Sequence, residues 1–276
     1  MMNFSVLQFS IGLLLAGLVA LAAFRLRLLS RSGALAAFGL GTVIFGFGGL
    51  RWAIVLMLFF LTSSGLSRLL RRRKQDAEGH YSKGATRDAW QVAANGGVAG
   101  FFVLLHLLLP QSTWPWLGFC AALAAANADT WATEIGALSR GQPRMLTTMN
   151  AVEPGTSGAV SGLGTLAALL GALVIAVAGV LFDPYAAMGS AQYVLVAITA
   201  GGILGCLVDS WLGATIQAIY YCPQCQKETE KTPLHGCGTQ TQLLRGLPWM
   251  NNDLVNLLCT LSGAIAAVLV VMLSGG

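Results

Sequence analysis

Eight apolar stretches, separated by short polar segments, follow one another along the chain. Each is close to the length of about 20 residues that a helix needs to cross roughly 30 Å of hydrocarbon. We therefore predict an all-α polytopic membrane protein with about eight transmembrane helices. Because the second and third stretches are short and could form one re-entrant pair, six or seven crossings are the alternatives. The predicted spans lie near residues 7–24, 33–49, 52–67, 90–109, 116–137, 157–182, 191–219 and 254–274.

Composition supports this class of protein and excludes a soluble one. Only 10% of the 276 residues are charged and 55% are hydrophobic, whereas soluble chains carry about 25% charged residues. The 34 glycines lie within apolar stretches, where small residues allow close helix packing in lipid. The net charge of +5 belongs to loops, and no basic patch interleaved with aromatic residues indicates a nucleic-acid partner. We treat residues 1–276 as a single integral-membrane domain.

The basic residues predict the orientation of the helices, because cytoplasmic loops retain Lys and Arg. With eight spans, the loops near 68–89, 138–156 and 220–252 are cytoplasmic and both termini face outward. We expect the protein in the plasma (inner) membrane of a bacterium. Arg51 alone lies on the outer side, and the cytoplasmic side receives Arg25, Arg27, Arg31, Arg68, Arg71, Arg72, Arg73, Lys74, Lys83, Arg87, Arg140, Arg144, Lys227, Lys231 and Arg245.

Three acidic side chains, Asp129, Glu134 and Asp209, fall inside predicted spans, where an ionisable group is costly and is by default a functional candidate. Asp129 and Asp209 share the pattern Asp-Thr/Ser-Trp, and Arg140 lies eleven residues after Asp129 as Tyr220 lies eleven residues after Asp209, both near the cytoplasmic ends of their helices. At 1.5 Å per residue this places both carboxylates about 16 Å from these ends, so they could face one another. The alternative is that each carboxylate is neutral or caps a buried hydroxyl.

Polar residues also mark the cytoplasmic halves of other spans, while the outer halves are almost purely apolar. This distribution predicts a polar cavity open to the cytoplasm, with an oxygen-rich and thiol-free lining that suits Mg²⁺. In the alternative interpretation, the amides join helices by hydrogen bonds. The expected lining includes Asp88, Gln91, Asn95, Asn127, Asn252 and Asn256, with Asp253 as a candidate metal ligand beside Asp129 and Asp209.

The loop before the sixth predicted span is a candidate phosphate site. Backbone N–H groups at a helix start bind anions, glycines permit close approach, and Arg supplies forked donors. The segment lacks a Walker motif, and its Pro, Ser and Thr residues are equally suited to capping a helix. The candidate phosphate-binding residues are Arg140, Arg144, Thr147, Thr148, Gly155, Thr156, Ser157 and Gly158.

The last large loop contains Cys222-Pro-Gln-Cys225 and His235-Gly-Cys237. These four side chains are the ligand set of a structural zinc site, and a reducing cytoplasm disfavours disulfides there. A redox-active or metal-free loop is the alternative, because the spacing between His235 and Cys237 is narrow for a zinc finger.

The motifs together resemble an integral-membrane family known as domain of unknown function number ninety-two, which includes plant phytyl-phosphate kinase. The resemblance covers the chain from about residue 30 onward. It rests on the segments 87–97, 128–136, 154–158, 222–237 and 252–256. The acidic span and the loop before the sixth span also resemble, more distantly, the membrane kinases of phytol and dolichol and the cytidylyltransferases of phospholipid synthesis. Several of these enzymes use CTP.

The resemblance implies a prenyl-phosphate kinase-like enzyme, and the residues agree with phosphoryl transfer from a nucleoside triphosphate to a phytyl- or geranylgeranyl-like monophosphate. Asp129 and Asp209 would hold Mg²⁺, Glu134 would assist them, and Arg144 would grip phosphate. The partners would be the nucleotide, the prenyl phosphate and membrane lipid, and a homo-oligomer is possible by Gly-x₃-Gly packing. The alternatives are a transporter or flippase of an anionic lipid phosphate and a CTP-dependent cytidylyltransferase.

Overall fold

The computed structural model describes residues 5–70, 86–184 and 191–273. Much of the predicted loop near 68–89, including Arg71, Arg72, Arg73, Lys74 and Lys83, lies outside these residues. Within the described residues the chain forms eight α-helices and one π-helical segment, which continues α2. They are α1 Val6–Arg25, α2 Arg31–Gly41, η1 Thr42–Gly48, α3 Leu50–Leu70, α4 Ala89–Leu108, α5 Trp114–Gly136, α6 Gly162–Leu181, α7 Ala191–Thr215 and α8 Asn252–Leu273.

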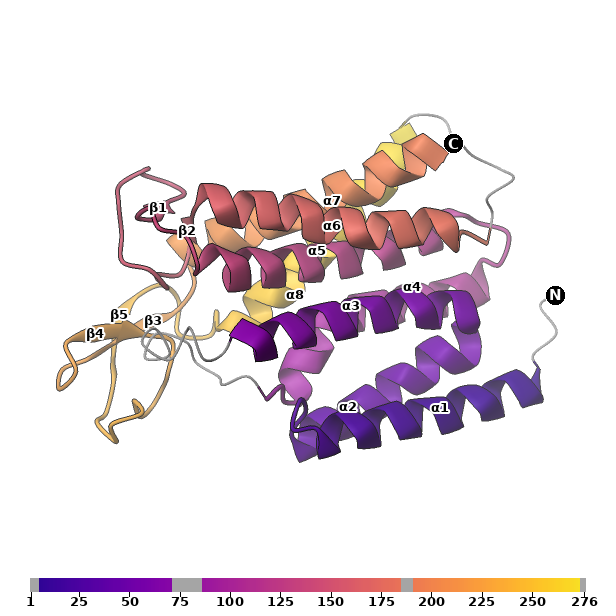
Figure 1. Cartoon of the computed structure of the whole chain (residues 1–276), viewed down its shortest axis with the longest axis horizontal. Helices are drawn as coiled ribbons and strands as arrows, with labels where there is room; N and C mark the ends of the chain where they lie inside the picture. The colour runs from indigo at the N-terminus through magenta and orange to yellow at the C-terminus, as the bar shows by residue number, and fades with distance from the viewer. Residues whose placement is uncertain (1–4, 71–85, 185–190, 274–276) are drawn as a thin grey trace.

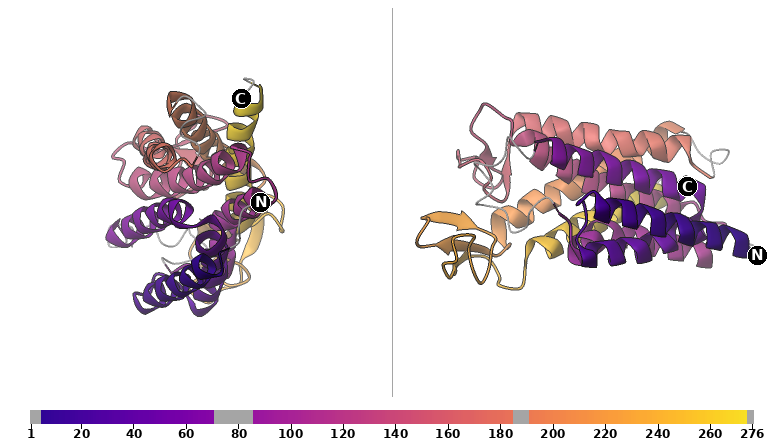
Figure 2. Two further views of the ribbon diagram at one scale, coloured as in Figure 1. Left: turned by 90° about the vertical axis from the view of Figure 1, so that its right-hand side faces the viewer. Right: turned by 60° about the horizontal axis from the view of Figure 1, so that its bottom comes forward.

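The helices run side by side along the long axis of the molecule (Figures 1 and 2). Both termini lie near one end of the bundle, and all the strands lie near the other (Figure 1). Strands β1 Arg144–Met145 and β2 Ala159–Val160 pair in the loop between α5 and α6. Strands β3 Ile219–Cys222, β4 Lys227–Thr229 and β5 Gln242–Arg245 form a three-stranded antiparallel sheet between α7 and α8. We call residues 219–245 the cap.

Among the residues that the structure describes, seven helical segments are long and apolar enough to cross a membrane, which confirms an all-α polytopic membrane protein. The second and third apolar stretches qualify separately, as Arg31–Gly48 and Leu50–Leu70. Helix α5 is not among the seven, because polar residues such as Asn127, Asp129 and Glu134 lower its hydropathy. It nevertheless packs against α3, α4, α6, α7 and α8, so its polar side chains lie inside the bundle and not against lipid.

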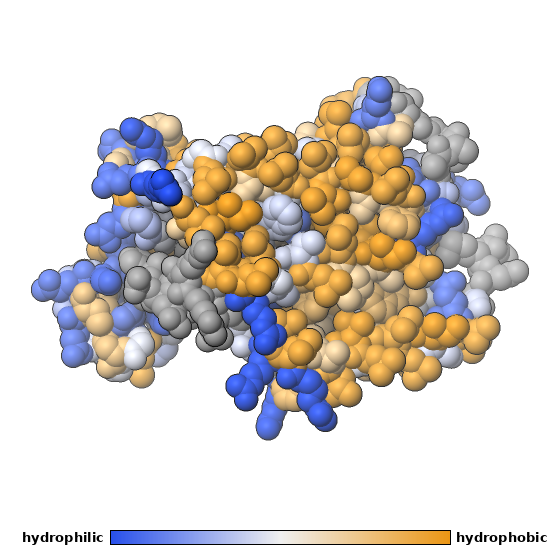
Figure 3. Space-filling view, viewed as in Figure 1, coloured by the Kyte–Doolittle hydropathy of each residue, from blue (hydrophilic) through white to orange (hydrophobic). Residues whose placement is uncertain are grey.

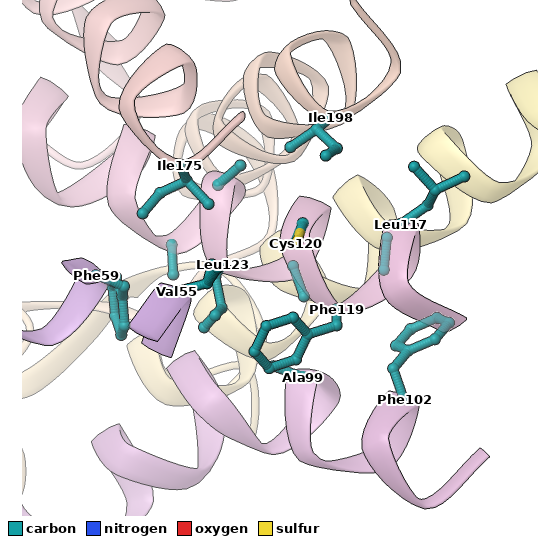
Figure 4. Packing of buried hydrophobic residues seen from close by; sticks show 14 of the residues in the cluster. Val55, Phe59, Ala99, Phe102, Leu117, Phe119, Cys120, Leu123, Ile175 and Ile198 are labelled. Carbon is teal, nitrogen blue, oxygen red and sulfur yellow. The ribbon is translucent and has the colours of Figure 1, made fainter. Parts of the chain in front are cut away.

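Helix α5 is the centre of the hydrophobic core. Every residue from 115 to 128 is buried, and Figure 4 shows Phe119, Cys120 and Leu123 among side chains of the surrounding helices. Its alanines are small enough for neighbouring backbones to approach closely. A Cβ added at Gly202 of α7 would lie 3.0 Å from the Cβ of Ala124. Close packing of α5 against α7 fixes the spacing of the polar residues that both helices carry farther along.

The molecular surface has the pattern expected of a protein in a bilayer. Large apolar side chains are exposed along the helices, and Figure 3 shows hydrophobic residues over most of the bundle, with hydrophilic residues toward its two ends and in one group at the lower edge of the view. Lipid tails remove the cost of exposing such side chains, which would be prohibitive in water. Examples are Leu14, Leu18, Leu35, Leu166, Leu181, Leu204 and Leu269.

Contacts at the helix ends agree with the predicted separation of charge. The Arg68 guanidinium donates to the Leu26 carbonyl over 3.1 Å, and the Ser30 N–H donates to the Arg87 carbonyl over 2.9 Å. The basic residues after α1, at the end of α3 and before α4 therefore lie at one end. Arg51 donates instead to the Asp183 carbonyl over 3.3 Å, beyond the far end of α6.

Two predicted boundaries are wrong. The span near 157–182 begins only at Gly162, because residues 159–160 form β2 and Ser161 caps the helix with its side chain. The span near 191–219 ends at Thr215, and Ile219 already belongs to β3. In both cases apolar residues outside the helix, such as Ala159, Val160 and Ile219, extended the hydrophobic run because they also suit a strand.

Candidate active site

A polar cavity of about 840 Å³ lies at the end of the bundle that carries the strands. Its walls come from α3 through α8, the loop before α6, and the cap. Carboxylate, amide, hydroxyl and cationic side chains therefore face one shared space. Of the residues predicted from the sequence, Gln91, Asn95, Asp129, Glu134, Gly155, Thr156, Ser157, Gly158, Asp209, Asn252 and Asn256 line it.

Asp129 of α5 and Asp209 of α7 meet in the lining of this cavity. Their side chains are within hydrogen-bonding contact of one another. The Oδ2 atom of Asp209 is buried and has no hydrogen-bond partner among the described residues. Two adjacent carboxylates, one with a buried oxygen that receives no hydrogen bond, form a site that could hold a divalent cation, since hard cations prefer oxygen ligands.

Glu230 is a third carboxylate at this site, and the sequence did not indicate it. It follows β4 in the cap, interacts electrostatically with Asp209 and lines the cavity. Its Oε1 accepts a hydrogen bond of 2.8 Å from Nε2 of Gln217. Gln217 is 1% exposed, and its Oε1 accepts a 2.7 Å bond from the Ser157 hydroxyl. Gln217 therefore connects the cap to the loop before α6.

Arg87 is the second residue that sequence reasoning did not assign to the site. It lies just before α4 and lines the cavity near Glu134. Burial lowers the pKa of the Arg87 guanidinium to about 10, and the Glu134 carboxylate opposes this shift. Arg87 therefore remains a cation at neutral pH. Glu134 also accepts a 2.9 Å hydrogen bond from the Ser67 hydroxyl.

Asp88 has a structural role, in contrast to its predicted place in the cavity lining. Its side chain accepts a hydrogen bond of 3.0 Å from the N–H of Gln91 and begins α4. The Gln91 side chain in turn accepts a 3.1 Å bond from the Asp88 N–H. This reciprocal pair is a capping box. It fixes the start of α4, so that Arg87, Gln91 and Asn95 line the cavity.

Residues 154–158, which we call the glycine loop, line the cavity but do not begin a helix. The predicted helix start at the end of this loop is wrong, because β2 separates the loop from α6. Arg245 of β5 holds the loop against α7. Its guanidinium donates to the carbonyls of Gly213 over 2.9 Å and Ser157 over 3.3 Å. The loop is therefore positioned by the cap.

Gly158 is required by its backbone conformation and by its closest neighbour. Its φ is +82°, and an added Cβ would overlap the backbone of Ala214 at the end of α7. We expect Gly158→Ala to cost about 1–3 kcal/mol in strain alone, with further loss from the overlap. Thermal unfolding in detergent should show a midpoint lowered by roughly 5 °C or more.

Gly238 provides the matched control for this variant. It has the same φ of +82°, but no atom lies within 4 Å of an added Cβ. Gly238→Ala should therefore show the strain without the overlap, and a smaller fall in the midpoint. Equal shifts for the two variants would contradict the close approach of the glycine loop to α7.

Several predicted residues lie away from the cavity. Asn127 is fully buried between helices, where its amide donates to the Gly171 carbonyl over 2.8 Å and accepts from Thr62 over 3.0 Å. This confirms the alternative interpretation for that residue, an amide joining helices. Asp253 lies in the first turn of α8 and does not line the cavity. Arg140, Arg144, Thr147 and Thr148 are exposed and also lie outside the lining.

Arg144 makes its contact within its own loop. Its guanidinium donates to the Met149 carbonyl over 2.7 Å, and its backbone pairs with Val160 in the sheet of β1 and β2. The side chain thus stabilises the loop between α5 and α6 and lies outside the cavity lining.

The four Cys and His side chains of the last loop converge in the cap. The ligand atoms of Cys222, Cys225, His235 and Cys237 all lie within 4.8 Å of one another. None of these cysteines is in a disulfide. The cluster therefore has the composition and spacing of a metal site, at the opposite end of β3 and β4 from the residues that reach the cavity.

An apolar cleft adjoins the polar cavity. It has a volume of about 70 Å³ and lies among α1, α2, η1, α3 and α4. Arg87, Gln91 and Asn95 line both spaces. The rest of its wall is apolar or small, as at Ala20 and Phe59. A molecule with a charged head and an apolar tail could therefore contact both spaces at once.

The fold and this cavity define a polytopic membrane protein with a carboxylate-rich site at one end of its helix bundle. The chain belongs to the family described as integral membrane protein DUF92, whose model matches residues 14–264. Protein PGR of Arabidopsis thaliana is 30% identical over 262 residues, which are 88% of this chain and 89% of that protein. An uncharacterized membrane protein of Methanocaldococcus jannaschii is 30% identical over 96% of this chain and 95% of its own length.

A third relative is the chloroplastic protein VTE6 of Arabidopsis thaliana. It is 27% identical over 245 residues, which are 87% of this chain and 65% of that protein. No solved structure matches the chain significantly.

Proposed function

We propose that this protein transfers the terminal phosphoryl group of a nucleoside triphosphate, with CTP favoured, to a prenyl monophosphate. An oxygen of the acceptor phosphate attacks the γ-phosphorus, and the bond from that phosphorus to the β–γ bridging oxygen breaks. The nucleoside diphosphate leaves with the electron pair, and the products are a prenyl diphosphate and NDP. The reaction would take place in the polar cavity, which we assign to the cytoplasmic side.

The observation that carries the proposal is the contact between the Asp129 and Asp209 side chains. One oxygen of this pair, Oδ2 of Asp209, is buried and receives no hydrogen bond from the described residues. Two carboxylates held this close repel one another unless a proton or a cation lies between them. Mg²⁺, when bound there, would neutralise charge on the nucleotide phosphates and orient them. Glu230 would face the same cation from the cap. Asp253, which does not line the cavity, has no part in this arrangement.

The cationic and small residues around the carboxylates suit the binding of two phosphate-bearing substrates, the nucleotide and the prenyl phosphate. Lys231 lines the cavity beside Glu230, and Arg87 lines it on the side of α4. The glycine loop adds small residues that allow phosphate oxygens to approach the backbone. These groups would replace Arg140, Arg144, Thr147 and Thr148 as the phosphate contacts. Charge neutralisation and alignment are the main requirements of phosphoryl transfer.

The acceptor needs no general base in this reaction, because a phosphate monoester is already anionic at neutral pH. The described lining of the cavity contains no histidine. His106 lies in α4 against Trp52, with 5.1 Å between the ring centroids, and His235 belongs to the cap cluster. The lining therefore agrees with an acceptor that arrives deprotonated.

The apolar cleft explains how a lipid acceptor would enter. A phosphate held by Arg87 would place the first part of its tail in the cleft, between apolar residues such as Leu56 and Phe59. Because the cleft is only about 70 Å³, most of a prenyl chain would lie in the bilayer. Burial of each CH₂ contributes about 0.8 kcal/mol, so even a short buried segment favours a lipid phosphate over a soluble one.

Family membership supports the same reaction class. The chain is 27% identical to protein VTE6, and its motifs resemble plant phytyl-phosphate kinase. That resemblance, together with the similarity to membrane kinases that use CTP, is the reason for favouring this nucleotide.

The test is to incubate the purified protein with a prenyl monophosphate, Mg²⁺ and each nucleoside triphosphate in turn, and to identify products by mass. We expect prenyl diphosphate and NDP, with the highest rate for CTP, and loss of product when EDTA is added. A boiled sample and a sample without lipid phosphate serve as controls.

Two results would contradict the proposal. Release of pyrophosphate with a cytidylylated lipid would identify a cytidylyltransferase. Absence of any product, combined with movement of a lipid phosphate across reconstituted vesicles, would identify a transporter or flippase.

A further inference from the structure

The Cys and His cluster of the cap is a chemical feature that the proposed reaction does not use. Cys222 ends β3, Cys225 lies in the turn that follows, and His235 and Cys237 lie in the loop before β5. Two separate turns thus bring four ligand atoms within 4.8 Å of one another. We propose that these four residues bind one structural Zn²⁺ ion, which fixes the cap against the mouth of the cavity.

The distances suit a tetrahedral site. The Sγ atoms of Cys222 and Cys237 are 3.6 Å apart, and Nδ1 of His235 is 3.3 Å from Sγ of Cys237. Zinc–sulfur bonds of about 2.3 Å in a tetrahedron place the sulfurs about 3.8 Å apart. These two separations are within a few tenths of an ångström of those in a zinc site, and all four ligand atoms lie within 4.8 Å of one another. Three thiolates and one imidazole are a ligand set that favours zinc over hard cations.

The backbone of both turns is shaped to present these ligands. The N–H of Gln226 donates to the Cys222 carbonyl over 2.9 Å, and Gln226 has a φ of +52°. In the second turn the N–H of Gly238 donates to the His235 carbonyl over 2.9 Å, and Gly238 has a φ of +82°. Each turn reverses the chain directly after its first ligand, which leaves the two ligands of that turn on the same side.

The cap also has too small a core to hold its shape without a cross-link. In residues 219–245, all of which the structure describes, the buried side chains are those of Ile219, Cys222 and Thr229. Each of its two strand pairings contains only three residue pairs. Segments this small usually require a disulfide or a metal ion for a fixed structure. The cysteines here are not in disulfides, so the cross-link that we propose is the metal ion.

Zinc in the cap would act on the cavity through β4. This strand runs from the first turn to Glu230, whose carboxylate binds Gln217, and Lys231 follows as a cavity residue. Arg245, at the end of β5, holds the glycine loop. The zinc ion would have no open position for a substrate, because all four of its ligands come from the chain. Each thiol that binds as a thiolate releases its proton to solvent.

Metal analysis of the untagged full-length protein tests the proposal. Elemental mass spectrometry should find about one zinc per chain, and Cys225→Ala and Cys237→Ala should each lower this to below about a tenth. Cys259→Ala is the matched control, because Cys259 is buried in α8, away from the cap. This control should retain about one zinc. These measurements do not depend on the proposed reaction.

Chelation of the unmodified protein provides a second measurement that does not require the variants to fold. Removal of zinc should open the cap, and trypsin should then cut after Lys227 and Lys231 at a rate at least about 10-fold higher. Restoring Zn²⁺ should restore the protection. A protein that contains no zinc as purified, or whose Cys222 and Cys237 are joined by a disulfide, would overturn the proposal, as would trypsin cleavage unchanged by chelation.

Discussion

Asp209→Asn is expected to reduce formation of prenyl diphosphate by at least about 100-fold, and Asp129→Asn to do the same. An amide has the size and shape of a carboxylate but lacks the charge that holds a divalent cation. Both variants should fold, because removing one of two adjacent carboxylates relieves repulsion. Initial rates at saturating CTP and Mg²⁺, together with thermal midpoints within a few degrees of the unmodified protein, would establish the result.

Asp183→Asn is the control for these variants. Asp183 lies beyond α6, at the end of the bundle remote from the cavity, and this variant should retain activity within about twofold. If both Asp129→Asn and Asp209→Asn retained activity, the pair would not bind the cation that the reaction requires, and the proposed mechanism would be refuted.

Arg87→Leu is expected to lower kcat/KM for the prenyl phosphate by about 100-fold or more. Arg87 is the cation that lines both the polar cavity and the apolar cleft, so its loss should weaken binding of an acceptor phosphate. The KM for CTP should change far less. Arg87→Lys should recover part of the activity, because a lysine keeps the charge and loses the forked donor geometry.

Arg68→Leu is the control for the loss of one positive charge at the end of the bundle that carries the cavity. Arg68 donates to the Leu26 carbonyl and does not line the cavity. Equal effects of Arg68→Leu and Arg87→Leu on the KM for the lipid would show that general surface charge attracts the substrate, and would remove Arg87 from the binding site.

The sequence predicted the helices and their charge distribution well because lipid imposes simple rules. A span must be long and apolar, and basic residues collect on one side. The pairing of Asp129 with Asp209 was also predictable, since both lie on helices and an equal number of residues corresponds to an equal depth. Helix α5 was recognised despite its polar residues because its alanine-rich half remains a long apolar run.

Residues outside the helices could not be placed in the same way. Glu230 and Lys231 follow β4 of the cap and line the cavity, and the position of the cap against the helices depends on contacts distant in sequence, such as that of Arg245 with Ser157. Arg144 appeared suited to phosphate, but it donates to Met149 in its own loop. Gln217 has no sequence signal of function, although it joins Ser157 to Glu230.

Asp88 and Arg87 show that the sequence did not predict which of two neighbouring residues lines the cavity. The sequence placed Asp88 with Gln91 and Asn95 in the expected cavity lining, yet Asp88 precedes α4 and caps it. Its neighbour Arg87, which pattern analysis assigned only to charge distribution, lines the cavity. The capping box therefore engages the Asp88 side chain, while the neighbouring Arg87 lines the cavity.

Binding of Mn²⁺ in place of Mg²⁺ tests most directly whether Asp129 and Asp209 share a divalent cation. Electron paramagnetic resonance of the protein in nanodiscs would count bound Mn²⁺ during a titration. We predict about one tight site that Mg²⁺ displaces, and affinity lowered by about 100-fold or more in Asp209→Asn and in Asp129→Asn. Unchanged Mn²⁺ binding in both variants would contradict the account.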